Sequence, residues 1–344
     1  MKKKVLIFQN YIAHYRVDFL KALSSKYSTD IYTSNKNDIK YNNLTLGFFN
    51  KISFFGFFFY SHITSLIKKN KYDVVILEAN PRIITFFYIY FIFHRKIKII
   101  FWGAQQLRNP ILNFIWTLFL KKSNAFFVFY SKSKYEPFGD YDSSRFHLVN
   151  NTIHVKSRIK AFNERKKLFF VNVGSFQARK QNDVLLIVFK QLITKKNDKL
   201  KLYLIGSGEE KPGLEKIISS LGLKKNAFII DETTDSDVLK FYYRHSIAAV
   251  SFGQAGLAVQ QSMAFGVPFI TKINAISGGE KDNIIHSHNG LICEDTEESL
   301  YETLSLLVDD INYARYLGMN AYNYYSKYCS MNNMINKFSK LIEN

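Results

Sequence analysis

The stretch SFGQAGLAVQQSMAFGVPFI, residues 251–270, is the part of this chain that says most about its fold. It opens with glycines and small residues, continues as an amphipathic segment, and ends with Gly266 and Pro268. Backbone N–H groups at such a turn can approach a phosphate or hydroxyl closely, and the N-terminus of a following helix favours negative charge. Gly266 suits a helix C-cap, and Pro268 prevents the helix from continuing. The stretch therefore predicts a ligand-binding turn, a helix and then an apolar strand.

The rest of the chain alternates strand-like runs with helical patterns, which favours parallel sheets covered by helices. The strand-like runs are VLIFQ (5–9), DIYTS (30–34), VVILE (74–78), IKIIFW (97–102), AFFVFY (125–130), FHLVNN (146–151), LFFVNVG (168–174), LKLYLIG (200–206), AFIID (227–231), AAVSF (248–252) and PFIT (268–271). Each half therefore reads as a Rossmann-like α/β unit with its active site at the carboxyl ends of the strands. With two such units, we expect the binding site in the cleft between them.

Charge is distributed unevenly along the 344 residues. Residues 1–160 hold 25 Lys+Arg against 8 Asp+Glu, or +17, whereas residues 161–344 hold 22 against 20, or +2. This difference predicts a domain boundary near residue 160. The first half also carries aromatic clusters at 48–60 and 84–93, which we expect to be core. Its basic surface predicts contact with an anionic membrane.

Other partner classes find little support in the sequence. There is no zinc-finger spacing, RNP-like motif or Arg-rich recognition helix, so nucleic acid is not an expected partner. The two cysteines cannot form a disulfide framework, which favours a reducing compartment. No apolar run is long enough to span a membrane, and no signal cleavage site follows the first strand. We expect a cytoplasmic protein, peripheral at the inner face of the cytoplasmic membrane.

The segment NVGSFQARKQNDVLL, residues 172–186, carries two cations directly after a glycine-containing turn. Arg179 and Lys180 stand where a helix begins, and positive charge there opposes the helix dipole. A solvated surface pair is the simpler interpretation, but that electrostatic cost favours a functional one. Two cations at this position can hold a diphosphate.

The 251–270 stretch resembles the donor-site signature EGFGLxxxEAMAxGxPV of the GT4-like (group 1) glycosyltransferases, bacterial enzymes of surface polysaccharides among them. The matching residues are Gly256, Leu257, Met263, Ala264, Gly266 and Pro268. Gly253 and Gln261 stand where the family has glutamates. The resemblance implies the GT-B fold, an α/β arrangement of two Rossmann-like domains facing a central cleft. It would comprise an N-terminal acceptor domain (1–160), a C-terminal donor domain (161–325), and a helix at 326–344 crossing back to the first domain.

Two further segments extend the resemblance. Residues 172–186 resemble GRLxxxKGxxxLI, with Lys180 at the family lysine, and residues 278–292 resemble GGxxExIxxxxNGxLV, which points to Glu280. Lys180 and Glu280 are thus implied catalytic residues. The residues implied to bind the donor nucleotide-sugar are Gly174, Arg179, Lys180, Gly253, Gln254, Ala255, Gly256, Leu257 and Gln261. Gly253–Gly256 would face the donor sugar and Gln261 the ribose.

The N-terminal segment QNYIAHYRVDFL (9–20) resembles the opening of bacterial polysaccharide glycosyltransferases. His14, Tyr15 and Arg16 are therefore candidates for binding the acceptor. The near-neutral pKa of histidine also makes His14 a candidate for catalytic proton transfer. A plain polar loop residue is the alternative for His14.

No metal or cofactor is expected from the sequence. Asp140–Asp142 and Asp235–Asp237 have the DxD form of metal-binding glycosyltransferases, but neither directly follows a strong buried strand. Asp235 reads instead as a helix N-cap. The histidines show no ligand spacing.

Taken in order, these motifs imply a metal-independent, hexosyltransferase-type enzyme. It would move a sugar, with retention of configuration, from a nucleotide-diphosphate donor to a lipid-linked glycan acceptor in lipopolysaccharide or capsule biosynthesis. Two alternatives stay open: a catalytically inactive binding or scaffold protein on the same fold, favoured by the absent glutamates, and a UDP-sugar epimerase. The acceptor-like loop and basic first half disfavour the epimerase, because its soluble substrate needs neither.

Overall fold

The computed structural model describes residues 2–36, 46–138, 144–164 and 166–344, which form two compact α/β units. Unit 1 comprises residues 1–150 together with 331–344, and unit 2 comprises residues 151–330. The boundary after Asn150 precedes the change in charge near residue 160. Residues just after it are tied to unit 2, since Tyr325 Oη donates a hydrogen bond to the Ile153 carbonyl (3.1 Å).

Unit 1 is built on a parallel seven-stranded sheet with the strand order β3-β2-β1-β6-β7-β8-β9. Its strands are β1 (Lys4–Gln9), β2 (Ser28–Thr33), β3 (Leu46–Phe48), β6 (Val74–Glu78), β7 (Lys98–Trp102), β8 (Phe126–Phe129) and β9 (Phe146–Leu148). The central strands are continuously apolar because helices cover both faces. In β1, Val5 and Ile7 enter one core cluster, whereas Leu6 and Phe8 enter the cluster on the opposite face.

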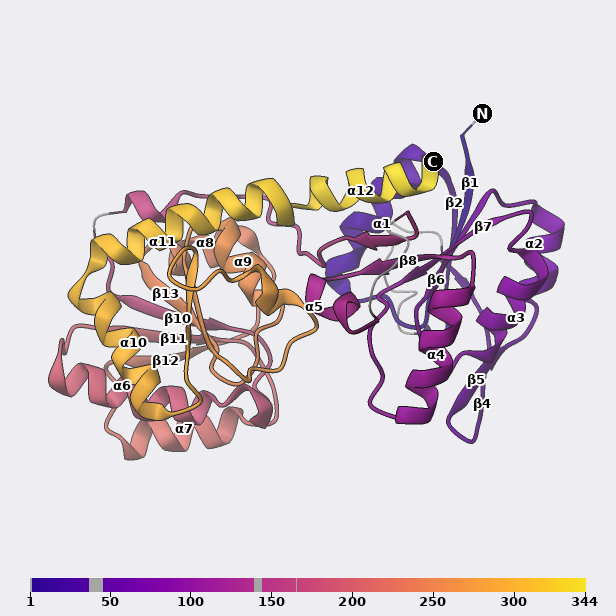
Figure 1. The fold of residues 1–344 in the computed structure, drawn as a ribbon. Helices are drawn as coiled ribbons and strands as arrows, with labels where there is room; N and C mark the ends of the chain where they lie inside the picture. Colours follow the sequence, from indigo (N-terminus) through magenta and orange to yellow (C-terminus); the bar gives the residue numbers. More distant parts are fainter. Residues whose placement is uncertain (1, 37–45, 139–143, 165) are drawn as a thin grey trace. The chain divides into compact units, whose positions relative to one another are not determined.

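The helices of unit 1 divide between these two faces (Figure 1). They are α1 (Val17–Lys26), α2 (Ile63–Asn70), α3 (Ile84–Phe93), α4 (Pro110–Lys122), α5 (Lys132–Tyr135) and α12 (Met331–Glu343). Helices α1 and α12 share a cluster with Val5 and Ile7, whereas α2, α3 and α4 pack with Leu6 and Phe8. Within α12, Phe338 packs edge-on against Phe19 and Trp102, at ring-centroid distances of 4.9 and 5.0 Å.

An antiparallel hairpin, β4 (Lys51–Phe54) with β5 (Phe57–Tyr60), was not predicted from the sequence. Its turn contains Gly56 at φ +78°, and the rings of Phe54 and Phe55 at its tip are exposed. The expectation that the aromatic cluster at 48–60 is core is therefore wrong for this tip, although Phe49 and Tyr60 are buried. The cluster at 84–93 forms α3, which is buried on one side only.

Unit 2 contains a parallel six-stranded sheet with the strand order β12-β11-β10-β13-β14-β15. Its strands are β10 (Phe169–Val173), β11 (Lys201–Ile205), β12 (Ala227–Ile230), β13 (Ser246–Val250), β14 (Phe269–Lys272) and β15 (Gly290–Cys293). Its helices are α6 (Asn182–Lys195), α7 (Lys211–Ser220), α8 (Ser236–Arg244), α9 (Ala258–Ala264), α10 (Glu297–Asp309) and α11 (Ile311–Tyr324). Apolar clusters again fill both faces of the sheet.

The structure confirms the predicted fold class, two Rossmann-like α/β units. The 251–270 stretch follows β13 directly and forms the turn, α9 and the start of β14, and Gly266 ends α9 at φ +72°. Any side chain at Gly266 would also collide with Phe162, because its Cβ would lie 2.7 Å from Cδ1 of the Phe162 ring. Within the described part of the chain, no helix has the length and apolar character needed to cross a bilayer.

Candidate functional site

Three loops of unit 2 meet at the carboxyl ends of β10, β13 and β14. Because these strands are neighbours in a parallel sheet, their following loops emerge at the same edge. The Gly253 N–H donates to the Lys180 carbonyl (3.1 Å), which joins the loop after β13 to the loop after β10. Ala255 N–H donates to Ile276 O (2.9 Å), and Ile276 N–H donates to Gly253 O (3.0 Å), which joins the third loop.

Lys180 is the main cation of this site. It ends a short 3₁₀ helix, Ala178–Lys180, and is only 8% exposed. Its ammonium lies beside Gly174, where the first carbon of any side chain would be 3.4 Å from Lys180 Nζ. Burial and the charge of Arg179 lower the pKa of the Lys180 ammonium to about 8, while the charge of Glu280 opposes this shift. No described residue forms a hydrogen bond or ion pair with that ammonium.

Glu280 is buried near Lys180, and three donors hold its carboxylate. Asn151 Nδ2 donates to Oε1 (3.2 Å), while the Gly278 N–H (2.9 Å) and Ser277 Oγ (3.4 Å) donate to Oε2. Sequence reasoning missed Asn151, which is buried and lies just after β9. A lone asparagine carries no signal of this role, because its partner is 129 residues away in the chain.

Gly253 occupies a position that excludes any side chain. A first side-chain carbon at this residue would lie 2.2 Å from the Arg179 carbonyl oxygen. The turn therefore packs its backbone directly onto the backbone that leads to Lys180. This close packing explains physically why a glutamate does not fit at position 253 in this chain.

The remainder of the turn is more open. Ala255 is fully buried, whereas Gln254, Gly256 and Leu257 are half-buried. A side-chain carbon built at Gly256 would meet no atom within 4 Å, and Gln254 Oε1 has no hydrogen-bond partner among the described residues. Open space and an unused amide oxygen are features that a polar ligand could use.

Gln261 lies in α9 and is only 7% exposed. Its Oε1 accepts a hydrogen bond from the hydroxyl of the fully buried Tyr243 (3.2 Å). This bond leaves the amide hydrogens of Gln261 as its remaining polar groups. A glutamate at this position would offer only hydrogen-bond acceptors. Gln261 instead offers a ligand the two N–H donors of its amide.

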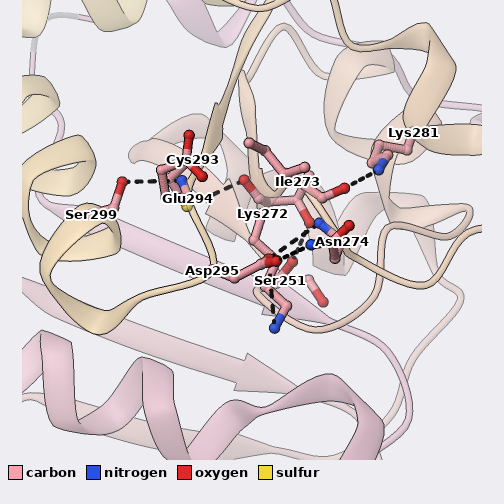
Figure 2. Close-up of polar contacts among 10 residues, drawn as sticks. Ser251, Lys272, Ile273, Asn274, Lys281, Cys293, Glu294, Asp295 and Ser299 are labelled. Atoms are coloured by element: carbon pink, nitrogen blue, oxygen red, sulfur yellow. Dashed lines mark hydrogen bonds and ion pairs between the residues drawn. The ribbon is translucent and has the colours of Figure 1, made fainter.

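A polar network braces the loop between β14 and Glu280 (Figure 2). Asp295, just after β15, accepts a hydrogen bond from the Asn274 N–H (3.2 Å) and lies 3.8 Å from the Lys272 ammonium. Lys281 donates to the Ile273 carbonyl. These contacts hold both ends of the segment between β14 and Lys281. Because Glu280 lies in this segment, they help to position its carboxylate.

In unit 1, the segment after β1 forms a 3₁₀ turn, His14–Arg16. His14 is exposed, and its ring lies edge-on to Tyr15 at 5.7 Å. Arg16 donates to Gln9 Oε1 and to Tyr130 Oη (2.6 Å), and its guanidinium stacks on the ring of Trp102 (4.6 Å). Arg16 is thus held by protein groups, whereas the imidazole of His14 is exposed to solvent.

Of the two DxD segments, only Asp235–Asp237 lies within the described residues. Asp235 accepts a hydrogen bond from the Asp237 N–H (2.8 Å) as the N-cap of α8, as predicted. Asp140–Asp142 lies outside the described residues. In the remainder of the chain, no three His, Cys, Asp or Glu side chains are placed to share a metal ion.

Comparison with known sequences gave a family match that lies within the second unit. The sequence model of the family described as "Glycosyl transferases group 1" matches residues 155–324. An uncharacterized glycosyltransferase of Haemophilus influenzae is 32% identical over 164 residues, which are 46% of this chain and 44% of that protein. The chain thus spans less than half the length of this curated relative.

Solved structures resemble the entire chain at low sequence identity. The HepE protein of Anabaena in complex with UDP superimposes with a TM-score of 0.75 over 100% of both chains, at 11% identity. The apo lipopolysaccharide outer core galactosyltransferase WaaB gives a TM-score of 0.72 over 99% of both chains, at 14% identity. These neighbours are GT-B glycosyltransferases, so the similarity shows that fold and confirms the predicted class.

Proposed function

We propose that the chain is a glycosyltransferase, because the sequence model described as "Glycosyl transferases group 1" matches residues 155–324. It would transfer a sugar from a nucleotide-diphosphate donor, bound by unit 2, to a glycan acceptor. The expectation that the donor is a nucleotide-sugar is supported by HepE, whose structure contains UDP.

One observation carries this proposal: Lys180 is only 8% exposed, yet its ammonium has no hydrogen-bond or ion-pair partner among the described residues. Removing a charge from water costs free energy unless an opposite charge compensates it. Glu280 lowers this cost only in part, since the pKa of Lys180 stays near 8. A diphosphate beside Gly174 would supply the missing negative charge.

The proposed reaction uses this charge on the leaving group. The bond between the sugar's anomeric carbon and the diphosphate oxygen breaks, and its electron pair stays on the diphosphate. An acceptor hydroxyl oxygen forms the new bond to the same carbon and releases its proton to a base. Lys180 and Arg179 would stabilise the negative charge that develops on the diphosphate. No step in this scheme requires a metal ion or another cofactor.

We retain His14 as the candidate base and Glu280 as a candidate catalytic residue, whose charge favours the protonated form of Lys180. We also propose that the anomeric configuration is retained, as the family resemblance implies.

We further propose that the acceptor is a lipid-linked glycan of a surface polysaccharide, with unit 1 at the inner face of the cytoplasmic membrane. WaaB, which shares the fold, acts in lipopolysaccharide core synthesis by its description. The strong positive charge of residues 1–160 suits an anionic membrane surface.

The proposal is tested by thermal denaturation of the purified protein with UDP, GDP, dTDP and CMP. A nucleotide at about 100 times its Kd stabilises the protein by about 2.7 kcal/mol. One of the nucleoside diphosphates should raise the Tm of the wild type. It should raise the Tm of Lys180→Arg by a smaller amount, and it should not change the Tm of Lys180→Met. Stabilisation of Lys180→Met equal to that of the wild type would contradict the assigned role of Lys180.

The two alternatives give different results. If no nucleotide changes Tm, a scaffold without a donor site is favoured. If a UDP-sugar bound without an acceptor is converted to its epimer, the epimerase is favoured. Transfer of labelled sugar to a glycolipid extract supports the glycosyltransferase.

A further inference from the structure

Unit 1 exposes a group of large apolar side chains on three neighbouring elements, which we call the apolar ridge. The ridge consists of Phe54 and Phe55 at the hairpin tip, Ile84, Tyr88, Phe91 and Ile92 on α3, and Ile111, Phe114, Ile115 and Leu118 on α4. Phe55 is 87% exposed and Phe114 is 71% exposed. Single exposed apolar residues are normal in proteins, but a contiguous group marks an interaction surface.

Each helix of the ridge has two apolar faces. In α3, Phe86 and Ile89 enter the core while Tyr88 and Phe91 face outward, and in α4 Trp116 is buried while Phe114 and its neighbours are exposed. The outward residues of α4, at 111, 114, 115 and 118, follow helical spacing. Core packing therefore accounts for only one face of each helix.

A cavity of about 600 Å³ opens between these elements. Aromatic and aliphatic side chains from β5, α3 and α4 line it, among them Phe57, Phe87, Phe91, Leu112, Ile115 and Phe119. Lys122, in the last turn of α4, also lines the cavity. The lining offers hydrocarbon contact along its length and a cation at one position.

The chain segment that carries the ridge is strongly positive. Residues 51–122, from β4 to α4, contain 11 Lys+Arg and 2 Asp+Glu, or +9. Lys51 Nζ lies over the ring of Phe58 at 3.9 Å, so the base of the hairpin carries a cation next to aromatic surface. Lys121 and Lys122 end α4 and are exposed. Cations bordering an apolar surface suit a layer of anionic headgroups over hydrocarbon.

We propose that the apolar ridge inserts into the headgroup–acyl boundary of an anionic phospholipid bilayer and that the cavity takes up one acyl chain. The inference deepens the membrane partner of the proposed function, and rests on it for its biological context. A second copy of this chain is a poorer occupant, because two such segments, each with a net charge of +9, would repel each other.

Vesicle sedimentation tests the insertion without any sugar transfer. We compare phosphatidylcholine vesicles with vesicles containing phosphatidylglycerol, using the wild type and the double variant Phe55→Ser/Phe114→Ser. We expect wild-type binding only to the anionic vesicles, and at least tenfold weaker binding by the double variant. The control is Phe241→Ser, which removes an exposed aromatic ring from α8 in unit 2. Equal binding by the double variant and the control, or self-association of the wild type through the ridge, would overturn the proposal.

Tryptophan fluorescence tests the cavity. Trp116 packs against Phe87 (6.1 Å) and Phe119 (5.7 Å), which both line the cavity. The chain has two tryptophans, so Trp102→Phe leaves Trp116 as the only one. Brominated acyl chains, which quench by contact, should quench Trp116 in anionic vesicles. Vesicle binding without quenching would exclude acyl-chain uptake.

These outcomes are separable from failure of the proposed function. Nucleotide-induced stabilisation is measured in the absence of lipid, and vesicle binding in the absence of nucleotide. Vesicle binding without nucleotide binding would support the ridge assignment and contradict the glycosyltransferase assignment. Nucleotide binding without vesicle binding would support the glycosyltransferase assignment and contradict the ridge assignment.

Discussion

Lys180 holds a charge that its protein surroundings compensate only partly. Its burial, the neighbouring Arg179 and the modest opposing effect of Glu280 set the pKa near 8. A buried ammonium that is only partly compensated lowers the stability of the empty protein and raises the affinity of the site for an anion. The consequences can be measured through pH.

Nucleotide affinity should fall as pH rises above about 8, because the Lys180 ammonium loses its proton there. Calorimetric titration with the stabilising nucleotide at pH 7.5 and 9.5 should show a decrease of about tenfold in the wild type. Lys180→Arg stays protonated over this range and should show little change. A flat profile for both proteins would exclude Lys180 from diphosphate binding.

The stability of the empty protein should show the opposite trend. The folded pKa of Lys180 is below its unfolded value, so the charged form is disfavoured by folding. This penalty is complete below pH 8 and disappears as pH rises from about 8 toward the unfolded pKa. At pH 7, Lys180→Met should therefore increase the free energy of unfolding by roughly 1–3 kcal/mol, measured by urea denaturation. A less stable Lys180→Met protein would contradict this account.

Gly253 gives a second prediction at the scale of single residues. Restoring the family glutamate with Gly253→Glu should destabilise the protein by about 2–4 kcal/mol and abolish nucleotide stabilisation, because the side chain would collide with the Arg179 carbonyl. Gly256→Ala is the matched control for stability, since its side chain meets open space. If the denaturation curves of Gly253→Glu and the wild type coincide, the prediction is wrong. The loops after β10 and β13 would then be able to move apart at little cost in free energy.

Helix α12 shows how a distant element completes a core. It belongs to unit 1 although residues 151–330 separate it from the rest of that unit. It contacts α1, and Lys3 Nζ donates hydrogen bonds to the carbonyls of Ile342 (2.9 Å) and Glu343 (2.8 Å). Unit 1 therefore depends on the last residues of the chain.

Truncating the central side chain of this helix should destabilise unit 1. Phe338→Ala removes a fully buried ring that packs on Phe19 and Trp102, and should cost about 3–5 kcal/mol in unfolding free energy. Asn336→Ala, on the exposed face of the same helix, should change stability by less than about 0.5 kcal/mol. Equal effects in the two variants would show that α12 contributes little to the core.

For the whole molecule, the two units should respond to different ligands. The nucleotide-binding loops lie in unit 2, whereas the basic and apolar surfaces lie in unit 1. In hydrogen exchange, a bound nucleotide should protect 172–186, 251–261 and 277–285. Anionic vesicles should protect 51–60, 84–93 and 110–122. Protection of the hairpin by nucleotide alone, or of the 251–261 turn by vesicles alone, would contradict this division.

The sequence alone determined the α/β class, the parallel order of elements and the location of the lysine loop. These features depend on local patterns: continuous apolar strands, glycine turns and helix caps such as Asp235 act within a few residues. The C-cap at Gly266 was predictable for the same reason.

Tertiary structure decided which surfaces are buried and which residues meet. Phe49 and Phe55 belong to one aromatic cluster in the sequence, yet the first is buried and the second exposed, because only the first has a packing partner on the sheet. The bond from Asn151 to Glu280 and the close approach of Gly253 to Arg179 likewise join segments far apart in the chain. Residue type sets what a side chain favours, but the elements that fold against it decide whether water, protein or a ligand surrounds it.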